Sequence, residues 1–133
     1  MSEAKDKEEN IVLIEKAKEA KKNSYSPYSK FKVGAALMTI ENKIYTGCNI
    51  ENSSYGATVC AERTAVFKAV SEGVRNFKKI AIASDLNDIT YPCGICLQVL
   101  SEFMPDGKII LEDKDKNIFV YKISELLPYA FCL

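Results

Sequence analysis

The sequence predicts an α/β domain in which one β-sheet lies between layers of helices. Its 133 residues are the length of a single domain. Apolar residues make up 47% of the chain and charged residues 27%, which is the balance of a globular protein. Helix-like and strand-like segments follow one another in the order α-β-β-α-β-α-β-β-α, as expected of a sheet covered by helices. We expect one domain over residues 10–133, preceded by a charged and flexible lead-in at 1–9.

The first half of the chain predicts a helix followed by a β-hairpin. Apolar residues at helical spacing predict an amphipathic helix over residues 10–23, and the turn around Pro27 ends it. Alternating apolar residues predict a strand over 31–37. The tight turn at 41–43 then leads into a second strand over 44–48.

The middle of the chain predicts two helices with a buried strand between them. A polar loop leads into a helix over 60–72, and Gly73 is placed to stop it. The short apolar run at 80–83 is typical of a strand that is covered on both faces. Pro92 stands at the start of the next helix, which continues over 93–103.

The last part of the chain predicts two more strands and a short helix. The strands cover 108–112 and 117–121, and the charged turn at 113–116 separates them. Ser124 is placed to cap a final helix that ends before Pro128.

Composition excludes several classes of protein. The net charge is zero, which argues against a nucleic-acid partner, and no apolar run is long enough to cross a membrane. The charged residues 2–10 lack the apolar region of a signal peptide, so we expect a cytoplasmic protein. Five cysteines in that reducing compartment indicate metal binding or catalysis, and with no histidine in the chain a zinc site must use cysteines or carboxylates.

Two short motifs at predicted helix starts carry the chemistry. Cys60-Ala61-Glu62 opens one helix, and a Pro-Cys-x-x-Cys motif places Cys93 and Cys96 on one face of the first turn of another. Helix N-termini carry partial positive charge, which favours the thiolate form that binds metal. Arg63 is a natural further donor to a ligand sulfur.

The same motifs leave a catalytic and a structural interpretation open. Three protein ligands leave the fourth position of Zn²⁺ for water, and Glu62 is placed to move that water's proton. Alternatively, Cys48 or Cys132 completes a structural site of four cysteines, or the Cys-x-x-Cys is a redox pair. A zinc ion held by four cysteines has no water for Glu62 to deprotonate, so a glutamate beside the ligand Cys60 favours the catalytic interpretation. Three cysteines, a Glu that is not a ligand and Pro-Cys-x-x-Cys are features of zinc deaminases.

The sequence resembles the small, homotetrameric, zinc-dependent cytidine deaminases of the cytidine and deoxycytidylate deaminase superfamily. The resemblance runs from about Tyr25 to Phe131, which is nearly the whole chain. Five stretches carry it: PYSKFKVGAA at 27–36, TGCNIEN at 46–52, CAERTA at 60–65, PCGIC at 92–96 and LLPYAF at 126–131.

The resemblance implies a three-layer α/β/α fold with a five-stranded mixed sheet and one Zn²⁺ per subunit. Cys60, Cys93 and Cys96 are the implied zinc ligands, and Arg63 compensates the charge of the thiolates. Zinc-bound hydroxide would attack C4 of cytosine while Glu62 shuttles the proton. Cytidine and 2′-deoxycytidine would yield uridine, 2′-deoxyuridine and ammonia, as in pyrimidine salvage.

The resemblance also implies which residues contact the nucleoside. Asn49 and Glu51 would bind the ribose, Phe31 would pack on the base, and the backbone N–H of Ala61 would meet it. Residues near a subunit interface, Tyr55 and Phe131, would reach a neighbour's active site. Four of these residues also have a purely structural interpretation: loop capping for Asn49 and Glu51, core packing for Phe31 and a C-terminal hydrophobic contact for Phe131.

Two departures and three rival functions remain. Leu97 stands where many relatives have Arg, and Tyr129 where they have Gly. The rivals are a deaminase of a cytosine-containing antibiotic such as blasticidin, a polynucleotide deaminase and a structural zinc module. The Asn49–Glu51 pair argues against the antibiotic, and the zero net charge argues against a polynucleotide. Glu62 argues against a purely structural zinc module.

Overall fold

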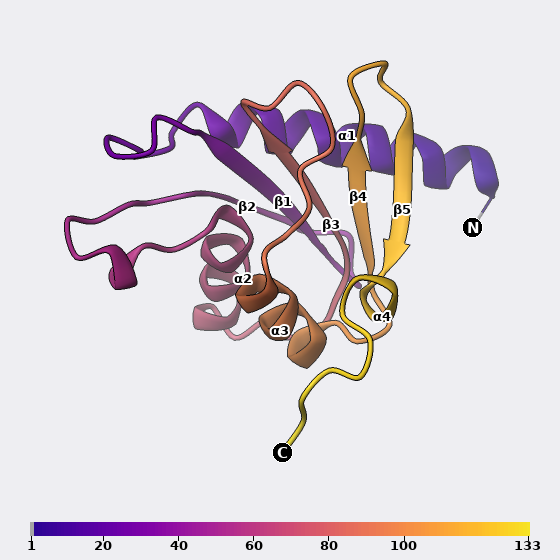
Figure 1. Cartoon of the computed structure of the whole chain (residues 1–133). Coiled ribbons are helices and arrows are strands. Elements are labelled where there is room, and N and C mark those ends of the chain that lie inside the picture. The colour runs from indigo at the N-terminus through magenta and orange to yellow at the C-terminus, as the bar shows by residue number, and fades with distance from the viewer. Residues whose placement is uncertain (1) are drawn as a thin grey trace.

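The computed structural model describes residues 2–133 and contains one five-stranded sheet between two layers of helices (Figure 1). The strand order is β2-β1-β3-β4-β5. Strands β3 and β4 are parallel and the other neighbours are antiparallel, so the sheet is mixed, as predicted. The strands are β1 (Val33–Thr39), β2 (Ile44–Cys48), β3 (Phe77–Ser84), β4 (Lys108–Glu112) and β5 (Ile118–Lys122).

The helices divide between the two faces of the sheet. Helix α1 (Glu3–Lys21) covers one face, and three helices cover the other (Figure 1). Those three are α2 (Ala61–Ser71), α3 (Gly94–Phe103) and the short α4 (Ile123–Leu126), and a 3₁₀ turn, η1 (Tyr55–Ala57), lies in the loop before α2. Within residues 2–133, no helix is both long and apolar enough to cross a membrane.

Two apolar cores hold these layers together, because the central strands are buried on both faces. The smaller core joins α1 to the sheet through Leu13, Ile14, Ala17, Ala36, Met38, Ala81 and Ile110. The larger core lies under α2 and α3 and includes Leu37, Val66, Ile80, Leu100, Ile109 and Leu111. The cysteine motifs are on the side of the larger core.

Two glycines let the helices lie directly on the strands. A Cβ atom at Gly34 would stand 2.0 Å from the backbone oxygen of Ala17 in α1, and one at Gly47 would stand 2.5 Å from the backbone nitrogen of Ala65 in α2. No side chain fits at either place. Gly47 therefore helps to set the position of α2, whose N-terminus carries part of the cysteine site.

Helix α1 begins seven residues earlier than predicted, so the charged segment at 3–9 is helical. Ser2 caps it by accepting a hydrogen bond from the backbone N–H of Lys5 at 3.1 Å. Lys79 on β3 forms ion pairs with the Asp6 and Glu9 carboxylates. The prediction that the helix starts at residue 10 is therefore wrong. It rested on the spacing of apolar residues, which cannot show that Lys79 pairs with Asp6 and Glu9.

Smaller differences concern the ends of other elements. Strand β1 begins at Val33, two residues later than predicted, and β3 extends beyond the predicted 80–83 at both ends. Helix α4 is capped by Lys122 and not by Ser124: the Lys122 backbone N–H donates to Glu125 Oε1 at 2.8 Å. Helix ends depend on such individual hydrogen bonds, which residue patterns describe poorly.

Candidate metal centre and substrate site

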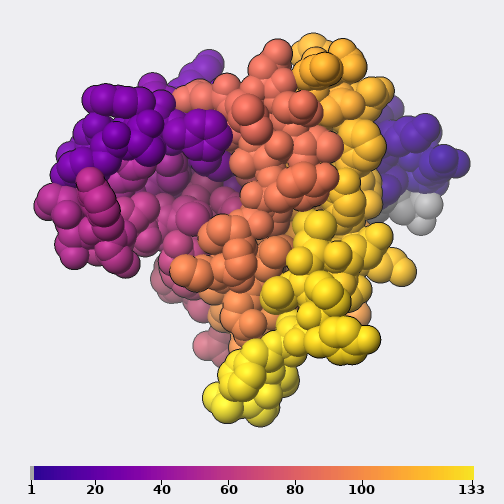
Figure 2. Space-filling view, in the orientation of Figure 1, coloured from indigo at the N-terminus to yellow at the C-terminus, as the bar shows by residue number. Residues whose placement is uncertain are grey.

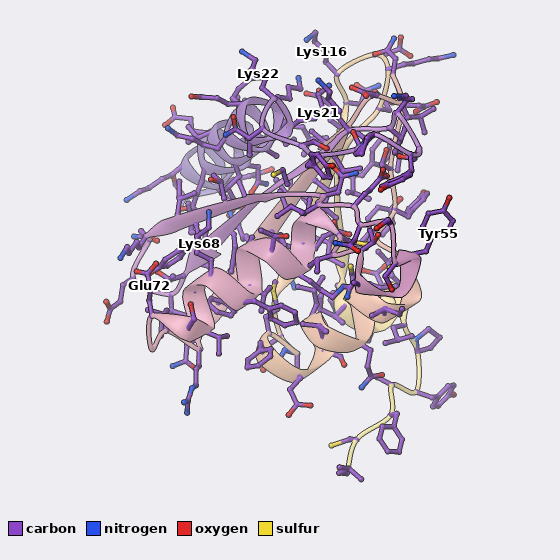
Figure 3. All side chains as sticks on the ribbon, turned by 90° about the vertical axis from the view of Figure 1, so that its left-hand side faces the viewer. Lys21, Lys22, Tyr55, Lys68, Glu72 and Lys116 are labelled. Atoms are coloured by element: carbon purple, nitrogen blue, oxygen red, sulfur yellow. The ribbon has the colours of Figure 1, made fainter. Side chains whose placement is uncertain are left out.

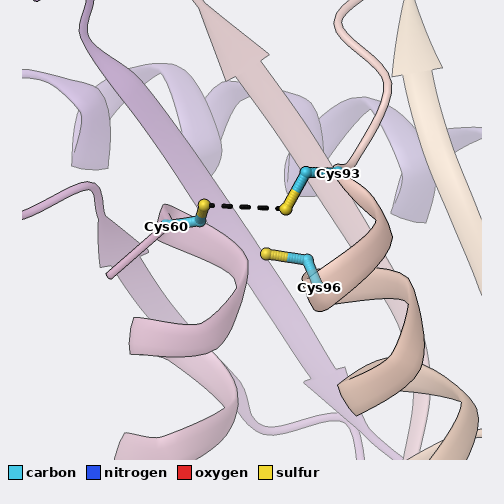
Figure 4. Close-up of side chains that lie close together, drawn as sticks. All are labelled: Cys60, Cys93 and Cys96. Atoms are coloured by element: carbon cyan, nitrogen blue, oxygen red, sulfur yellow. Dashed lines mark hydrogen bonds between the residues drawn. The ribbon is translucent and has the colours of Figure 1, made fainter. Parts of the chain in front are cut away.

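Three cysteines from two helix N-termini meet at one point (Figure 4). Cys60 is the N-cap residue of α2, Cys93 is the N-cap residue of α3, and Cys96 lies in the first turn of α3. Their Sγ atoms all lie within 4.8 Å of one another, and those of Cys60 and Cys93 are 3.9 Å apart. The structure thus brings together the three ligands that the sequence predicted.

This group fits a zinc ion. Zn–S bonds are about 2.3 Å long, so tetrahedral geometry places two sulfurs about 3.8 Å apart, close to the observed 3.9 Å. Cys48 and Cys132 are not members of the group, so the structural alternative with four cysteines is not formed among residues 2–133. Three thiols can hold one metal ion and leave one position for a water or substrate atom.

The surroundings of the sulfurs favour negative charge. The Cys60 thiol shares a hydrogen bond with Cys96, and Arg63 Nη2 donates to Cys60 Sγ at 3.5 Å. The bond with Cys96, supported by Arg63 and Cys93, lowers the pKa of Cys60 to about 5. The pKa of Cys96 is raised because this thiol keeps the proton of the pair. Arg63 therefore lies where the sequence placed a charge-compensating group.

Glu62 lies in the first turn of α2, next to the sulfurs and closed off from solvent. Only 4% of the residue is exposed, and no salt bridge reaches its carboxyl group from the residues that the structure describes. Burial raises the pKa of Glu62 to about 7, and the charge on Cys60 adds to the increase. A carboxyl group with such a pKa can both take up and release a proton near neutral pH.

Asn49 is buried at the end of β2, and the protein itself uses most of its amide. Its Oδ1 accepts hydrogen bonds from the Val33 backbone N–H at 2.9 Å and from the Ser24 hydroxyl. Its Nδ2 donates to the Phe31 carbonyl at 2.8 Å. One N–H of the amide group is left to act as a donor.

Glu51 binds the turn that precedes β1. Its Oε1 accepts from the backbone N–H groups of Tyr28 at 2.9 Å and Ser29 at 3.1 Å, and its Oε2 accepts from the Ser29 hydroxyl. These hydrogen bonds, and those of Asn49, are the ones expected if both residues cap the loops around them, which is their structural interpretation. The segment also lies beside the metal centre, because Ile50 pairs with Val59, the residue before Cys60.

The remaining predicted contact residues differ in their exposure to solvent. Ala61 is fully buried at the start of α2, whereas Phe31 is partly exposed. Tyr55 and Phe131 are 75% and 69% exposed. The η1 loop, where Tyr55 is labelled in Figure 3, and the C-terminal segment project from separate sides of the molecule (Figures 1 and 2). One chain does not bring Tyr55 and Phe131 together.

The two departures from the relatives have different surroundings. Leu97 is buried in the core under α2 and α3, so the position that carries Arg in many relatives here belongs to the core. Tyr129 is fully exposed and has a φ of 56°, a left-handed conformation that favours glycine. That conformation explains why glycine suits the position.

Sequence reasoning missed Ser24 and Ser29. Their hydroxyls hold the side chains of Asn49 and Glu51, which lie 25 and 22 residues away along the chain. The sequence offers only a weak signal, namely that both serines stand in the turn before a strand. Residue spacing could not have indicated such partners.

Comparisons with known proteins agree with this site. The family model described as the cytidine and deoxycytidylate deaminase zinc-binding region matches residues 7–112. The cytidine deaminase of Sporosarcina psychrophila is 50% identical over 120 residues, covering 90% of this chain and 88% of that protein.

A solved structure of cytidine deaminase from Burkholderia pseudomallei superposes with a TM-score of 0.86 and 44% identity, covering 91% of this chain and 98% of that one. The blasticidin-S deaminase of Bacillus cereus is more distant, at 31% identity over 132 residues and 93% of each chain. Family, fold and the three-cysteine group confirm the resemblance to zinc-dependent cytidine deaminases. This chain belongs to the cytidine and deoxycytidylate deaminase zinc-binding family.

Proposed function

We propose that this protein is a cytidine deaminase with one Zn²⁺ per subunit that hydrolyses cytidine and 2′-deoxycytidine to uridine, 2′-deoxyuridine and ammonia, as in pyrimidine salvage. The observation that carries the proposal is the buried Glu62 carboxyl group, which no cation of residues 2–133 pairs with in a salt bridge, beside three thiols that fit zinc. Relatives that are close over most of their length bear the name cytidine deaminase. The blasticidin-S deaminase is much less similar, so the antibiotic is the weaker candidate substrate.

In this proposal Glu62 carries protons during the reaction. Bound zinc supplies a water whose pKa is lowered toward about 7, so that it can act as a nucleophile. Glu62, with a pKa of about 7, takes the proton of that water and passes it to N3 of the cytosine ring. Glu62 then takes the second proton of the added water, now on the hydroxyl group at C4, and gives it to the departing amine, so that ammonia leaves and the C4 carbonyl of uridine remains. Arg63 stabilises the negative charge on Cys60 throughout.

The sugar is held through a hydroxyl group at the 3′ position. Asn49 has one free N–H, which donates to the hydroxyl oxygen, and Glu51 accepts the hydroxyl proton. A hydroxyl group can do both at once, whereas an analogue without it leaves both partners unpaired and is rejected. We place Phe31 against the cytosine ring and the Ala61 backbone N–H at its edge.

We further propose a cytoplasmic homotetramer whose active sites are shared between subunits. Tyr55 and Phe131 are large, exposed and separated on one chain, and each would complete the site of a neighbour. A reducing compartment suits the five free cysteines, three of which must stay reduced to bind metal.

The direct test mixes the purified, zinc-loaded protein with cytidine and follows the formation of uridine. We expect turnover in the wild type and a kcat lower by at least about a hundredfold in Glu62→Gln. Blasticidin S is the comparison substrate, and turnover of blasticidin S without turnover of cytidine would replace the proposed substrate. A protein that binds zinc stoichiometrically but deaminates neither compound would contradict the proposal.

A further inference from the structure

Glu51 owes its position to Ser29, a residue with no assigned role. The Ser29 hydroxyl accepts a hydrogen bond from the Phe31 backbone N–H at 3.0 Å. A hydroxyl group has one proton, and here it points to Glu51 Oε2. The Ser29 backbone N–H also donates to the other carboxylate oxygen, at 3.1 Å. One residue therefore contacts both oxygens of Glu51.

These contacts decide what Glu51 can do. Three donors converge on the carboxylate: the backbone N–H groups of Tyr28 and Ser29 and the Ser29 hydroxyl. They favour the ionised form, and the Ser29 hydroxyl bond is the main reason that the pKa of Glu51 is lowered. An ionised carboxylate only accepts hydrogen bonds. Glu51 is thus held as a pure acceptor, with lone pairs free on Oε2.

The carboxylate faces a hollow where a ligand has room. Ser29, Glu51, Tyr28, Tyr55 and Thr58 line a hollow of about 380 Å³. Thr58, at one side of the hollow, lies two residues before the metal-site residue Cys60 in the sequence. Tyr28 and Tyr55 pack edge to face with ring centroids 5.7 Å apart, which gives the hollow an apolar wall.

We propose that Ser29 is a positioning residue that orients Glu51 for the sugar hydroxyl and so contributes to specificity for nucleosides that carry it. The proposal rests on the proposed function, because it assumes that Glu51 binds the sugar of cytidine. Ser29 itself touches no reacting atom: it acts through Glu51. Removing its hydroxyl leaves the two backbone donors on Oε1 and no donor to hold Oε2 in place.

The test compares cytidine with 3′-deoxycytidine, using wild type, Ser29→Ala and Ser29→Thr. For Ser29→Ala we expect KM for cytidine to rise about tenfold with kcat within about threefold, since a hydrogen bond to a charged group is lost. The preference for cytidine over 3′-deoxycytidine, as a ratio of kcat/KM values, falls by the same factor. Ser29→Thr keeps the hydroxyl and restores the preference.

Two controls separate this role from a merely structural one. Ser53→Ala removes a nearby exposed serine that makes no side-chain hydrogen bond in the described part of the chain, and it leaves the preference unchanged. The pKa of the Glu51 carboxyl group, followed by ¹³C NMR, rises in Ser29→Ala and not in Ser53→Ala. An equal loss of kcat/KM for both substrates in Ser29→Ala, or an unchanged preference, overturns the proposal. Absence of cytidine turnover in the wild type instead overturns the proposed function, and this inference with it.

Discussion

Two ionisable side chains are buried on opposite faces of the sheet, and their surroundings differ sharply. Lys79, on the face covered by α1, is 7% exposed, and Glu62, on the face covered by α2 and α3, is 4% exposed. Lys79 Nζ lies 2.7 Å from Glu9 Oε1 and 2.8 Å from Asn10 Oδ1, and it also pairs with Asp6. Glu62 has no cationic partner in a salt bridge among residues 2–133.

The difference indicates that Lys79 stabilises the fold, whereas Glu62 is suited to proton transfer. A buried charge with its partners stays ionised and holds two elements together, here α1 and β3. A buried carboxyl group without a cation has a raised pKa, and it can exchange protons near neutrality. We therefore expect substitutions at Lys79 to affect stability and substitutions around Glu62 to affect turnover.

The largest effect is expected from removing a metal ligand. Cys96→Ala takes away the most buried of the three thiols, and two remaining sulfurs hold zinc poorly. We expect zinc content to fall well below one per subunit and uridine formation to become undetectable. Zinc measured by atomic absorption after dialysis checks this. Cys132→Ser, which changes an exposed thiol outside the group, keeps its metal. Full zinc content in Cys96→Ala would contradict the assigned ligand set.

Glu62→Gln sharpens the chemical side of the comparison. The amide keeps the shape of the side chain and cannot carry a proton, so we expect kcat to fall by about 10²–10⁴-fold. Zinc content should not change, since Glu62 is not among the three grouped ligands. Steady-state kinetics with parallel metal analysis measures both. The matched control is Glu72→Gln, an exposed carboxylate at the other end of the same helix. Activity close to wild type in Glu62→Gln would remove Glu62 from the mechanism.

Lys79→Met tests the structural side. The change leaves Asp6 without its cation and Glu9 with Lys78 alone, and breaking such a buried pair costs about 3 kcal/mol. We expect the free energy of unfolding to fall by about this amount, while kcat and zinc content of the folded enzyme stay the same. Urea unfolding measures the change. Lys43→Met removes an exposed pair with a separation of 3.9 Å and should cost less than about 0.5 kcal/mol. A large drop in kcat for Lys79→Met would break the proposed separation of roles.

The smallest expected effect concerns pH and Glu9. Lys79 and Lys78 outweigh the opposing effect of burial, so the pKa of Glu9 is lowered. A lowered pKa means that the folded state binds fewer protons, so the stabilisation is present above about pH 4.5 and is lost as the pH falls through the folded pKa. We expect wild type to exceed Glu9→Gln by about 1 kcal/mol at pH 7. The difference should shrink below pH 4.5 in urea unfolding. A constant difference across this range would show that Glu9 acts through packing alone.

Much of the chemistry could be predicted from local sequence. Cys93 and Cys96 lie three residues apart at a helix start, so helical geometry alone puts them on one side of that helix. Glu62 follows Cys60 by two residues, so the sequence places both at the start of one helix. The helices over 60–72 and 93–103 and all five strands were also predictable, because hydrophobic periodicity and turn residues are local properties.

Only the tertiary structure decided which distant groups meet. It brought Cys60 to Cys93, 33 residues away, and Lys79 to Asp6, 73 residues away, which extended α1 to Glu3. It also placed Ser29 against Glu51. The pattern of residues in a segment predicts its local secondary structure, which depends on neighbours along the chain. The pKa of Glu62 and the orientation of Glu51 depend on burial and on partners from other segments, and those exist only once the layers have packed.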